Sequence, residues 1–261
     1  MTSLVIGSSS QLAYYFPKNY MIISSREIDL RQYQNKFYDR VFLCFAEQRT
    51  FIENDLNLFL ETNVTYTLKL IEFFISRCNK LIVYGTSELW NQHDGEITID
   101  SVPSFDKTPY IFSKGVMTLA IKQLRMDDEI YKNVIILHPC NFNSIHRKEG
   151  FLFSKIFNSI KYKKKIEIGD TNFKRCLVHP KYVVERSILA EEDEIIGSGR
   201  LTFVNDFIRE LYKYCNLKYE DYVSENYNCN LKLKRKIYYL DSKQTYNNLL
   251  EDTVNDIKKI K

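Results

Sequence analysis

Short apolar runs recur through the first half of this 261-residue chain, and each is followed by a helix-like segment. The runs are residues 3–6, 20–23, 41–45, 81–84 and 133–137, which are rich in β-branched, leucine and aromatic side chains. Runs of this length and composition are typical of strands buried in a parallel sheet. Because strands that alternate with helices build βαβ units, the chain is predicted to be an α/β protein with a Rossmann-type, doubly wound parallel sheet.

The overall composition excludes several classes of partner. The chain is long enough to bury a substantial core, and its net charge of +4 gives no reason to expect binding to nucleic acid or to an anionic membrane. No apolar stretch is long enough to span a bilayer, and the N-terminus lacks the basic region of a signal peptide. We therefore expect a cytoplasmic protein.

The cysteines and histidines show no metal-binding pattern. The six cysteines form no Cys-x-x-Cys pair, and several of them lie in apolar runs. The four histidines lack the spacing of zinc ligands. Buried free thiols in a reducing compartment, without a bound metal, are the expectation.

Candidate catalytic side chains follow the run at residues 81–84. The segment 108–114 reads Thr-Pro-Tyr-Ile-Phe-Ser-Lys, and a proline before an apolar run predicts a helix start. Tyr110 and Lys114 are then four residues apart on one helix face, where the lysine could stabilise a phenolate. Thr86 could hold a substrate oxygen between them. Such a Tyr-Lys spacing also occurs by chance on solvated helices, so the surrounding motifs decide.

The turn after the first run is a candidate phosphate-binding loop. A strand, a turn of small residues and a helix would point helix N-terminal amides at a pyrophosphate. Ser10 and Ala13 stand where glycines are usual, and a serine-rich helix cap is nearly as good an interpretation. The candidate cofactor-binding residues in this turn are Gly7, Ser9, Ser10, Gln11 and Leu12.

The end of the second run indicates which dinucleotide would bind. Ser25 and Arg26 follow it, whereas an acidic residue at this position would bind the ribose hydroxyl of NAD. An arginine accommodates the 2′-phosphate of NADP, so NADP(H) is favoured over NAD(H). An exposed loop arginine without a ligand is the alternative.

Taken in order along the chain, these motifs resemble the extended short-chain dehydrogenase/reductases that modify nucleotide sugars. Part of the pattern looks like GDP-mannose 4,6-dehydratase, and the short segment 25–30 is similar to dTDP-4-dehydrorhamnose reductase. The segments that carry the resemblance are 7–13, 45–48, Asn63, 85–90, Tyr110 with Lys114, 138–142, 169–184 and 195–208.

The resemblance implies a role for each matching residue. Tyr110 would be the acid/base, Lys114 would bind the nicotinamide ribose and lower the pKa of Tyr110, and Thr86 would bind the sugar oxygen. Ala46 would contact the cofactor. The substrate-binding residues would be Ser87, Asn141, Arg147, Lys155 and Arg175.

The chain departs from the family pattern outside the glycine turn as well. Gly85 stands where serine is common, and His138 replaces an arginine. Cys176 replaces the acidic residue that usually follows the late arginine. The role of Arg175 as an anchor for the diphosphate depends most on this last position.

The reaction expected from the resemblance is NADPH-dependent reduction of a nucleotide-diphosphate 4-keto sugar, a GDP-sugar in surface-polysaccharide (capsule) synthesis being favoured. A 4,6-dehydratase or epimerase that retains NAD(P), with Glu88 as base, is the alternative, and a catalytically silent NAD(P)-binding protein is a third. Residues 1–145 would form the NADP-binding domain and 146–261 mainly a small substrate-binding lobe, with some segments returning to the first domain. A homodimer is expected.

Overall fold

The computed structural model describes residues 2–26, 28–49, 55–90, 95–103, 108–226, 238–240 and 245–259. The chain forms two compact units, which are described separately here. The first comprises the described parts of residues 1–90, 101–139 and 184–196, and the second those of 91–100, 140–183 and 197–261. The first unit thus ends its main segment at residue 139, and residues 95–100 belong to the second unit, where their strand pairs with residues 238–240.

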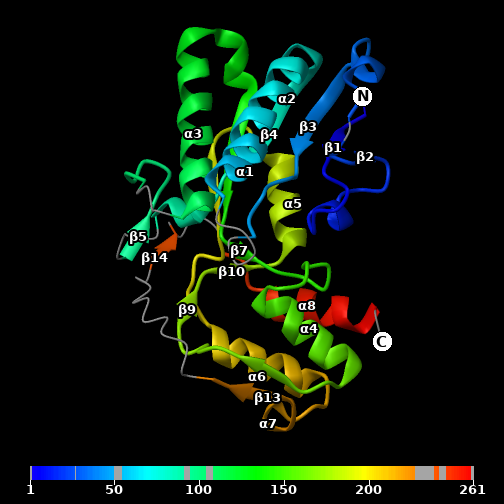
Figure 1. Ribbon diagram of the computed structural model, residues 1–261, viewed down its shortest axis with the longest axis vertical. Coiled ribbons are helices and arrows are strands. Elements are labelled where there is room, and N and C mark those ends of the chain that lie inside the picture. The colour runs from blue at the N-terminus through cyan, green and yellow to red at the C-terminus, as the bar shows by residue number, and fades with distance from the viewer. Residues whose placement is uncertain are drawn as a thin grey trace. The chain divides into compact units, whose positions relative to one another are not determined.

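The first unit is built on a parallel sheet. In the described part of the chain its six strands follow the order β2-β1-β3-β4-β6-β11, and every neighbouring pair is parallel. Figure 1 shows this sheet with helices beside it, and the predicted fold class is confirmed. The strands are β1 (Leu4–Ile6), β2 (Met21–Ile23), β3 (Tyr38–Leu43), β4 (Cys78–Tyr84), β6 (Val134–Pro139) and β11 (Glu194–Ile196).

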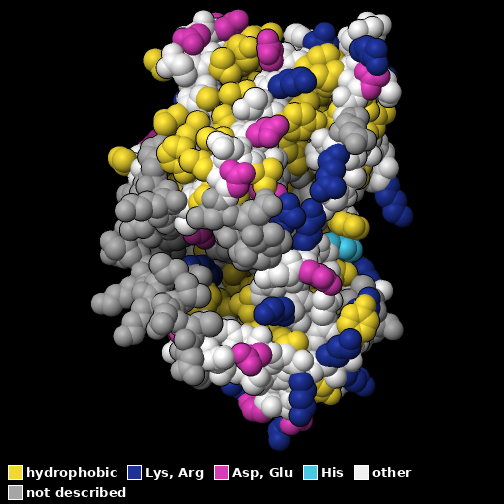
Figure 2. Space-filling model, viewed as in Figure 1, with side chains coloured by type: hydrophobic (Ala, Val, Ile, Leu, Met, Phe, Trp, Pro, Cys, Tyr) yellow, Lys and Arg dark blue, Asp and Glu magenta, His cyan; other side chains and the backbone are white. Residues whose placement is uncertain are grey.

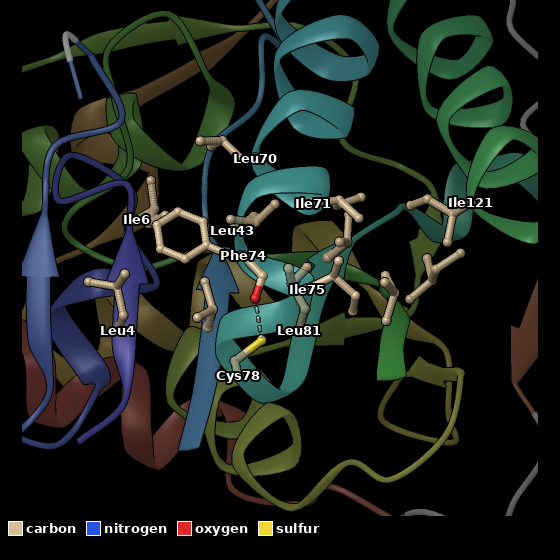
Figure 3. Close-up of a cluster of buried hydrophobic side chains, with 14 of the residues drawn as sticks. Leu4, Ile6, Leu43, Leu70, Ile71, Phe74, Ile75, Cys78, Leu81 and Ile121 are labelled. Atoms are coloured by element: carbon tan, nitrogen blue, oxygen red, sulfur yellow. Dashed lines mark hydrogen bonds between the residues drawn. The ribbon is translucent and has the colours of Figure 1, made fainter. Parts of the chain in front are cut away.

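Helices α2 (Tyr66–Phe74) and α3 (Pro109–Asp127) cover one face of the sheet. Figure 3 shows Leu70 and Phe74 of α2 directed at side chains of β1 and β3, in a cluster that Ile121 of α3 also joins. Burial of each such side chain contributes about 1.5–3 kcal/mol. This packing fixes α3 against the carboxyl half of β4.

Different elements cover the opposite face. Strand alternation turns Tyr84 to the side away from Val83, and its hydroxyl donates a 2.9 Å hydrogen bond to Ser187 on α5 (Pro180–Leu189). Phe42 packs there against the ring of Phe16, with centroids 4.8 Å apart. The sheet is thus covered on both faces, as a doubly wound fold requires.

The connections between successive strands differ in length and structure. Between β3 and β4 the chain forms α1 (Leu56–Leu60), a π-helical segment Glu61–Thr65 and α2. The β1–β2 connection holds only the 3₁₀ helix Ala13–Tyr15, and the described residues between β2 and β3 hold only the 3₁₀ helix Leu30–Tyr33. Because β2 and β3 lie on opposite sides of β1, the strand order reverses there, at the position where ligands bind in open α/β sheets.

The second unit consists of helices and short strand pairs. Its longer helices include α4 (Leu152–Tyr162) and α6 (Val204–Tyr214). His179 Nε2 lies 3.0 Å from Asp256 Oδ2, and both side chains are buried. The other elements are β5 (Gly95–Ile97), β7 (Asn141–Phe142), β8 (Ile166–Ile168), β9 (Lys174–Arg175), β10 (Leu177–Val178), β12 (Thr202–Phe203), α7 (Tyr219–Tyr222), β13 (Val223–Glu225), β14 (Tyr238–Leu240) and α8 (Leu249–Lys259).

None of the helices within the described ranges has both the length and the apolar character needed to cross a membrane. The cysteines at 44, 78, 140, 176 and 215 are buried and free, and Cys229 lies outside the described residues.

Candidate active site

Gly7 marks the point where the tips of β1 and β3 meet. Its φ of +126° is a conformation that favours glycine. A Cβ at this position would lie 2.6 Å from the carbonyl oxygen of Cys44. The amides of Gly7 and Ser8 both donate to Ile23 O, at 2.8 and 2.9 Å. Only glycine therefore fits between β1, β2 and β3 at the switch point.

The helix expected after Gly7 is absent. One turn of 3₁₀ helix, Ala13–Tyr15, takes its place, and Pro17 follows two residues later. Proline lacks the amide that a continuing helix needs, and β2 begins soon after it. The expectation of a helix N-terminus aimed at a pyrophosphate is wrong for this chain.

The remaining residues of the turn form a compact loop. Ser10 Oγ accepts the Leu12 amide at 3.3 Å, and the Ser10 amide donates to Gly7 O at 2.9 Å. Ser9 is exposed, whereas Gln11 and Leu12 are buried. The small, exposed part of the turn leaves its backbone open beside the strand switch, which fits the approach of a dinucleotide phosphate.

The other predicted cofactor residues lie at neighbouring strand ends. Arg26 is exposed after β2, and its amide donates to Ser24 Oγ at 3.1 Å. The adjacent carbonyl of Ser25 accepts a 2.7 Å hydrogen bond from the hydroxyl of Tyr66 on α2. Ala46 is half-buried after β3. Parallel strands end at one edge of a sheet, so the structure places these residues along the same edge as Gly7.

Asn63 connects the loop after β3 to helix α3. Its side chain accepts the Glu47 amide at 2.8 Å and donates to Glu47 O at 2.9 Å and to Ser113 Oγ at 3.0 Å. Ser113 Oγ in turn donates to the carbonyl of Tyr110 at 2.9 Å. The π-helical segment holds this buried amide at the contact, which explains a polar residue in the middle of a helix.

Tyr110 and Lys114 occupy the first turns of α3, as predicted from Pro109. Tyr110 is half-buried, and Lys114 is 2% exposed. Lys114 Nζ donates a 2.7 Å hydrogen bond to the carbonyl of Tyr84 at the end of β4. Burial lowers the pKa of Lys114 to about 7. A bound anion or a developing phenolate nearby would therefore favour the charged form of the ammonium group.

Thr86 begins the loop after β4, and its side chain is oriented by the next turn. Thr86 Oγ1 accepts the amide of Glu88 at 3.2 Å, within the 3₁₀ helix Ser87–Trp90. This leaves the proton of the Thr86 hydroxyl to donate. Ser87 is 1% exposed, and its Oγ finds no hydrogen-bond partner among the described residues. Both hydroxyls suit recognition of a polar ligand.

Two residues beside these were not placed in the predicted site. From the sequence, Asn63 and His138 stood only among the segments that carry the family resemblance, and His138 also as a departure from the family pattern. His138 is buried, and its Nδ1 lies 3.3 Å from the amide nitrogen of Thr86. No local signal reveals either contact, because both partners are distant in the sequence.

The second unit holds the other predicted substrate residues. Arg175, on β9, lies over the ring of Phe173, with its guanidinium carbon 5.2 Å from the centroid. Asn141, on β7, is half-buried and pairs in register with Leu177 of β10. The β7–β10 pairing thus places Asn141 beside a strand that begins two residues after Arg175.

Arg147 precedes α4, and Lys155 is the fourth residue of that helix. The guanidinium carbon of Arg147 is 3.6 Å from the ring centroid of Phe151. Lys155 is exposed on the helix. Arg147 is thus held in place by an aromatic ring, whereas Lys155 projects from a solvated helix surface.

Cys176, which follows Arg175, is buried and receives hydrogen bonds from its neighbours. Its Sγ accepts the amide of Ser198 at 3.2 Å. A hydrogen bond from Cys140 and those from Ser198 lower the pKa of Cys176 to about 7, against the effect of burial. A thiol more acidic than an ordinary cysteine therefore follows Arg175 directly in the sequence.

Solved structures share this fold over nearly the whole chain. RMD from Pseudomonas aeruginosa complexed with NADPH superposes with a TM-score of 0.80 at 14% identity, covering 100% of this chain and 99% of that one. UDP-N-acetylglucosamine 4-epimerase from Methanobrevibacter ruminantium M1 gives 0.81 at 15% identity, covering 98% and 97%. UDP-glucose 4-epimerase from Thermotoga maritima gives 0.80 at 18% identity, covering 99% and 98%. At these identities the likeness shows the fold alone.

Family membership follows from the sequence. No curated protein sequence matches the chain. The model of the family described as "NAD dependent epimerase/dehydratase family" matches residues 25–197, which is more than half of the chain. This confirms the predicted class of NAD(P)-dependent, nucleotide-sugar enzymes of the short-chain dehydrogenase/reductase type. The chain belongs to the NAD-dependent epimerase/dehydratase family.

Proposed function

We propose that this protein is an NADPH-dependent reductase of a nucleotide-diphosphate 4-keto sugar. The observation that supports reduction over the other reactions of the family is the short β1–β2 connection, which has no α-helix to hold a pyrophosphate. A dehydratase or an epimerase keeps its cofactor through a full cycle of oxidation and return. A reductase exchanges its cofactor at every turnover, so weaker binding suits it.

The side chains near α3 supply the proton chemistry. When bound, a reduced nicotinamide supplies the hydride. Tyr110 donates its phenolic proton to the carbonyl oxygen of the sugar, and Thr86 donates a hydrogen bond to the same oxygen. A phenolate at Tyr110 favours the charged form of Lys114, against the burial that lowers the pKa of this lysine. The buried Ser87 hydroxyl would gain a partner on the sugar.

Basic side chains suggest the cofactor and the substrate. Arg26 at the end of β2 supports NADPH, and the solved complex of RMD with NADPH is in accord with that choice. Arg175, Arg147, Lys155 and Asn141 are proposed to bind the nucleotide diphosphate and its sugar. A guanidinium group pairs well with phosphate oxygens. The preference for GDP rests on sequence resemblance.

A dehydratase is the second candidate, and the position of Glu88 favours it. Glu88 follows Thr86 and Ser87 in the same 3₁₀ helix, and it is half-buried. A carboxylate there could abstract a proton from the sugar while Tyr110 acts at the neighbouring oxygen. This alternative requires a cofactor that stays bound.

We also propose that the protein forms a homodimer through α3. Phe112, Leu119 and Met126 recur every seven residues, so they share one face of the helix, and they are 38%, 52% and 81% exposed. Figure 2 shows hydrophobic side chains gathered over this part of the first unit. Leu119→Lys should yield a monomer in light scattering, whereas Leu189→Lys, at an exposed leucine on α5, should leave the dimer intact.

A direct assay tests the reaction. The protein would be incubated with NADPH and 4-keto-6-deoxy sugars linked to GDP, dTDP or UDP, and the loss of NADPH absorbance followed with product analysis. We expect one equivalent of NADPH to be consumed for each reduced sugar. Conversion of a nucleotide sugar without net consumption of NADPH would favour the dehydratase or epimerase instead.

A further inference from the structure

The imidazole of His138 fills the space beside Gly85. His138 is 2% exposed near the end of β6, and Gly85 follows the last residue of β4. A Cβ at Gly85 would lie 2.4 Å from His138 Nδ1 and 2.6 Å from its Cε1. The ring therefore occupies the volume that any side chain at position 85 would need. The two residues form one packed pair directly before Thr86.

The hydrogen bonds around Thr86 indicate which imidazole nitrogen carries the proton. The Thr86 amide donates to His138 Nδ1 at 3.3 Å, and no other acceptor for this amide is present among the described residues. The Thr86 carbonyl lies 3.4 Å from the same nitrogen, but it accepts the amide of Leu89 and so has a partner without the imidazole, whereas, among the described residues, the Thr86 amide does not. An unpaired buried amide is costly, so His138 acts as the acceptor and carries its proton on Nε2.

The surroundings keep this imidazole neutral. The pKa of His138 is lowered to about 4, mainly by burial and also by the charges of Lys122 and Lys114, against the opposite effects of Asp193 and the Thr86 backbone. The ring of Trp90 meets that of His138 edge to face, with centroids 5.0 Å apart. The residue is therefore an uncharged acceptor at neutral pH, held on a second side by an aromatic ring.

We propose that His138 is a positioning residue for the catalytic Thr86, an inference that rests on the proposed reductase function. The imidazole holds the Thr86 peptide from one side while Lys114 Nζ holds the Tyr84 carbonyl two residues earlier. With its peptide fixed and its Oγ1 accepting the Glu88 amide, Thr86 presents its hydroxyl proton in one direction. His138 itself exchanges no proton with the substrate.

Variants of His138 separate the hydrogen bond from packing. His138→Asn places an amide oxygen near the position of Nδ1 and keeps the acceptor, whereas His138→Leu has a similar size and no acceptor. We expect His138→Leu to lower kcat by roughly tenfold to a hundredfold with little change in NADPH affinity, the effect of a misplaced catalytic group. His138→Asn should retain most of kcat. Val134→Ala, at the other end of β6, is the control for lost packing and should leave kcat unchanged below its melting temperature.

The packed pair predicts a compensation. Gly85→Ala alone should lower kcat and the melting temperature, because its methyl group would overlap the imidazole. Combined with the smaller side chain of His138→Asn, the same alanine should recover part of both losses. A Gly85→Ala variant as active as the wild type, or a double variant no better than the single one, would overturn the proposal.

A measurement without substrate separates this inference from the proposed reaction. ¹⁵N NMR of histidine-labelled protein should show His138 as the Nε2–H tautomer near neutral pH, with a bare Nδ1. Protonation at Nδ1, or equal kcat for His138→Leu and the wild type, would refute the positioning role. If the wild type reduces no 4-keto sugar nucleotide, the proposed reaction fails, while the tautomer and the melting temperatures still decide the contact.

Discussion

The first unit contains two regions that differ in how their residues are held. The β4–α3 region includes Tyr110, Lys114 and Thr86, and the β1–β2 region includes Gly7 and Arg26. In the β4–α3 region, buried polar groups with hydrogen-bond partners hold Tyr110, Lys114 and Thr86, and long helices support them. In the β1–β2 region, the 3₁₀ helices Ala13–Tyr15 and Leu30–Tyr33 stand where a full dinucleotide fold has α-helices, and Arg26 is exposed. The residues proposed for proton transfer thus lie among buried polar groups, whereas those proposed to bind the cofactor lie in short, partly exposed connections. This is the pattern expected of an enzyme that exchanges its cofactor freely.

The largest effect should come from a substitution in the β4–α3 region. Tyr110→Phe removes the acid while keeping the ring, so turnover should fall by about 10²–10⁴-fold. Steady-state kinetics and circular dichroism would check activity and folding together. Tyr214→Phe, at an exposed tyrosine of α6, is the matched control and should keep full activity. Undiminished turnover by Tyr110→Phe would show that the acid lies elsewhere.

A substitution at Gly7 tests whether the β1–β2 region depends on the close contact between β1 and the end of β3. Gly7→Ala would place a methyl group against Cys44 O in a conformation that alanine disfavours, costing about 1–3 kcal/mol of stability. Denaturant unfolding would measure this cost, and NADPH affinity should fall with it. Gly169→Ala has open space around its Cβ and should change neither. Equal unfolding free energies for the two variants would mean that the β1–β3 contact is looser than described.

Lys114 predicts a pH dependence of stability for the cofactor-free protein. Its pKa is about 7 in the folded state and 10.5 as the ordinary value, so between these values the unfolded chain binds more protons. The free energy of unfolding should therefore gain, from this group, up to about 1.4 kcal/mol for each pH unit as the pH rises from 7 towards 10. The slope should be smaller by this amount in Lys114→Met. Identical slopes in the two proteins would contradict the buried, readily deprotonated lysine.

Arg26 should give the smallest effect, because it is exposed. Arg26→Ala should weaken NADPH binding by about fivefold, the size expected of an exposed ion pair, and leave NADH binding unchanged. Fluorescence titration with both cofactors would measure this. Arg31→Ala removes another exposed arginine of the same connection, one that pairs with Asp29, and serves as the control. Equal losses for NADPH and NADH would remove Arg26 from the 2′-phosphate site.

Local patterns in the sequence were sufficient for much of the fold. The apolar runs marked strands of the sheet, and Pro109 marked the start of α3, because both signals lie within a few residues. Tyr110 and Lys114 followed from helix spacing alone. The missing helix after Gly7 was harder, since the same small-residue turn precedes helices in other dinucleotide folds, and only Pro17 opposed it.

Contacts between distant segments could not be predicted in this way. Gly85 and His138 stood out as two separate departures from the family pattern, and the structure shows that they are one packed pair. Asn63 needed a partner that only the folded chain supplies, at Glu47 and Ser113. The pairing of residues 95–97 with 238–240 likewise depends on strands far apart in the sequence.

Cofactor retention tests the contrast between the β4–α3 region and the β1–β2 region most directly. The purified protein would be examined for bound nicotinamide by absorbance and mass spectrometry, and then titrated with NADPH and NADH. We predict no retained cofactor and tighter binding of NADPH than of NADH. One equivalent of nicotinamide dinucleotide surviving purification would contradict the account. The β1–β2 region would then bind the cofactor tightly, and the reaction would be that of a dehydratase or an epimerase.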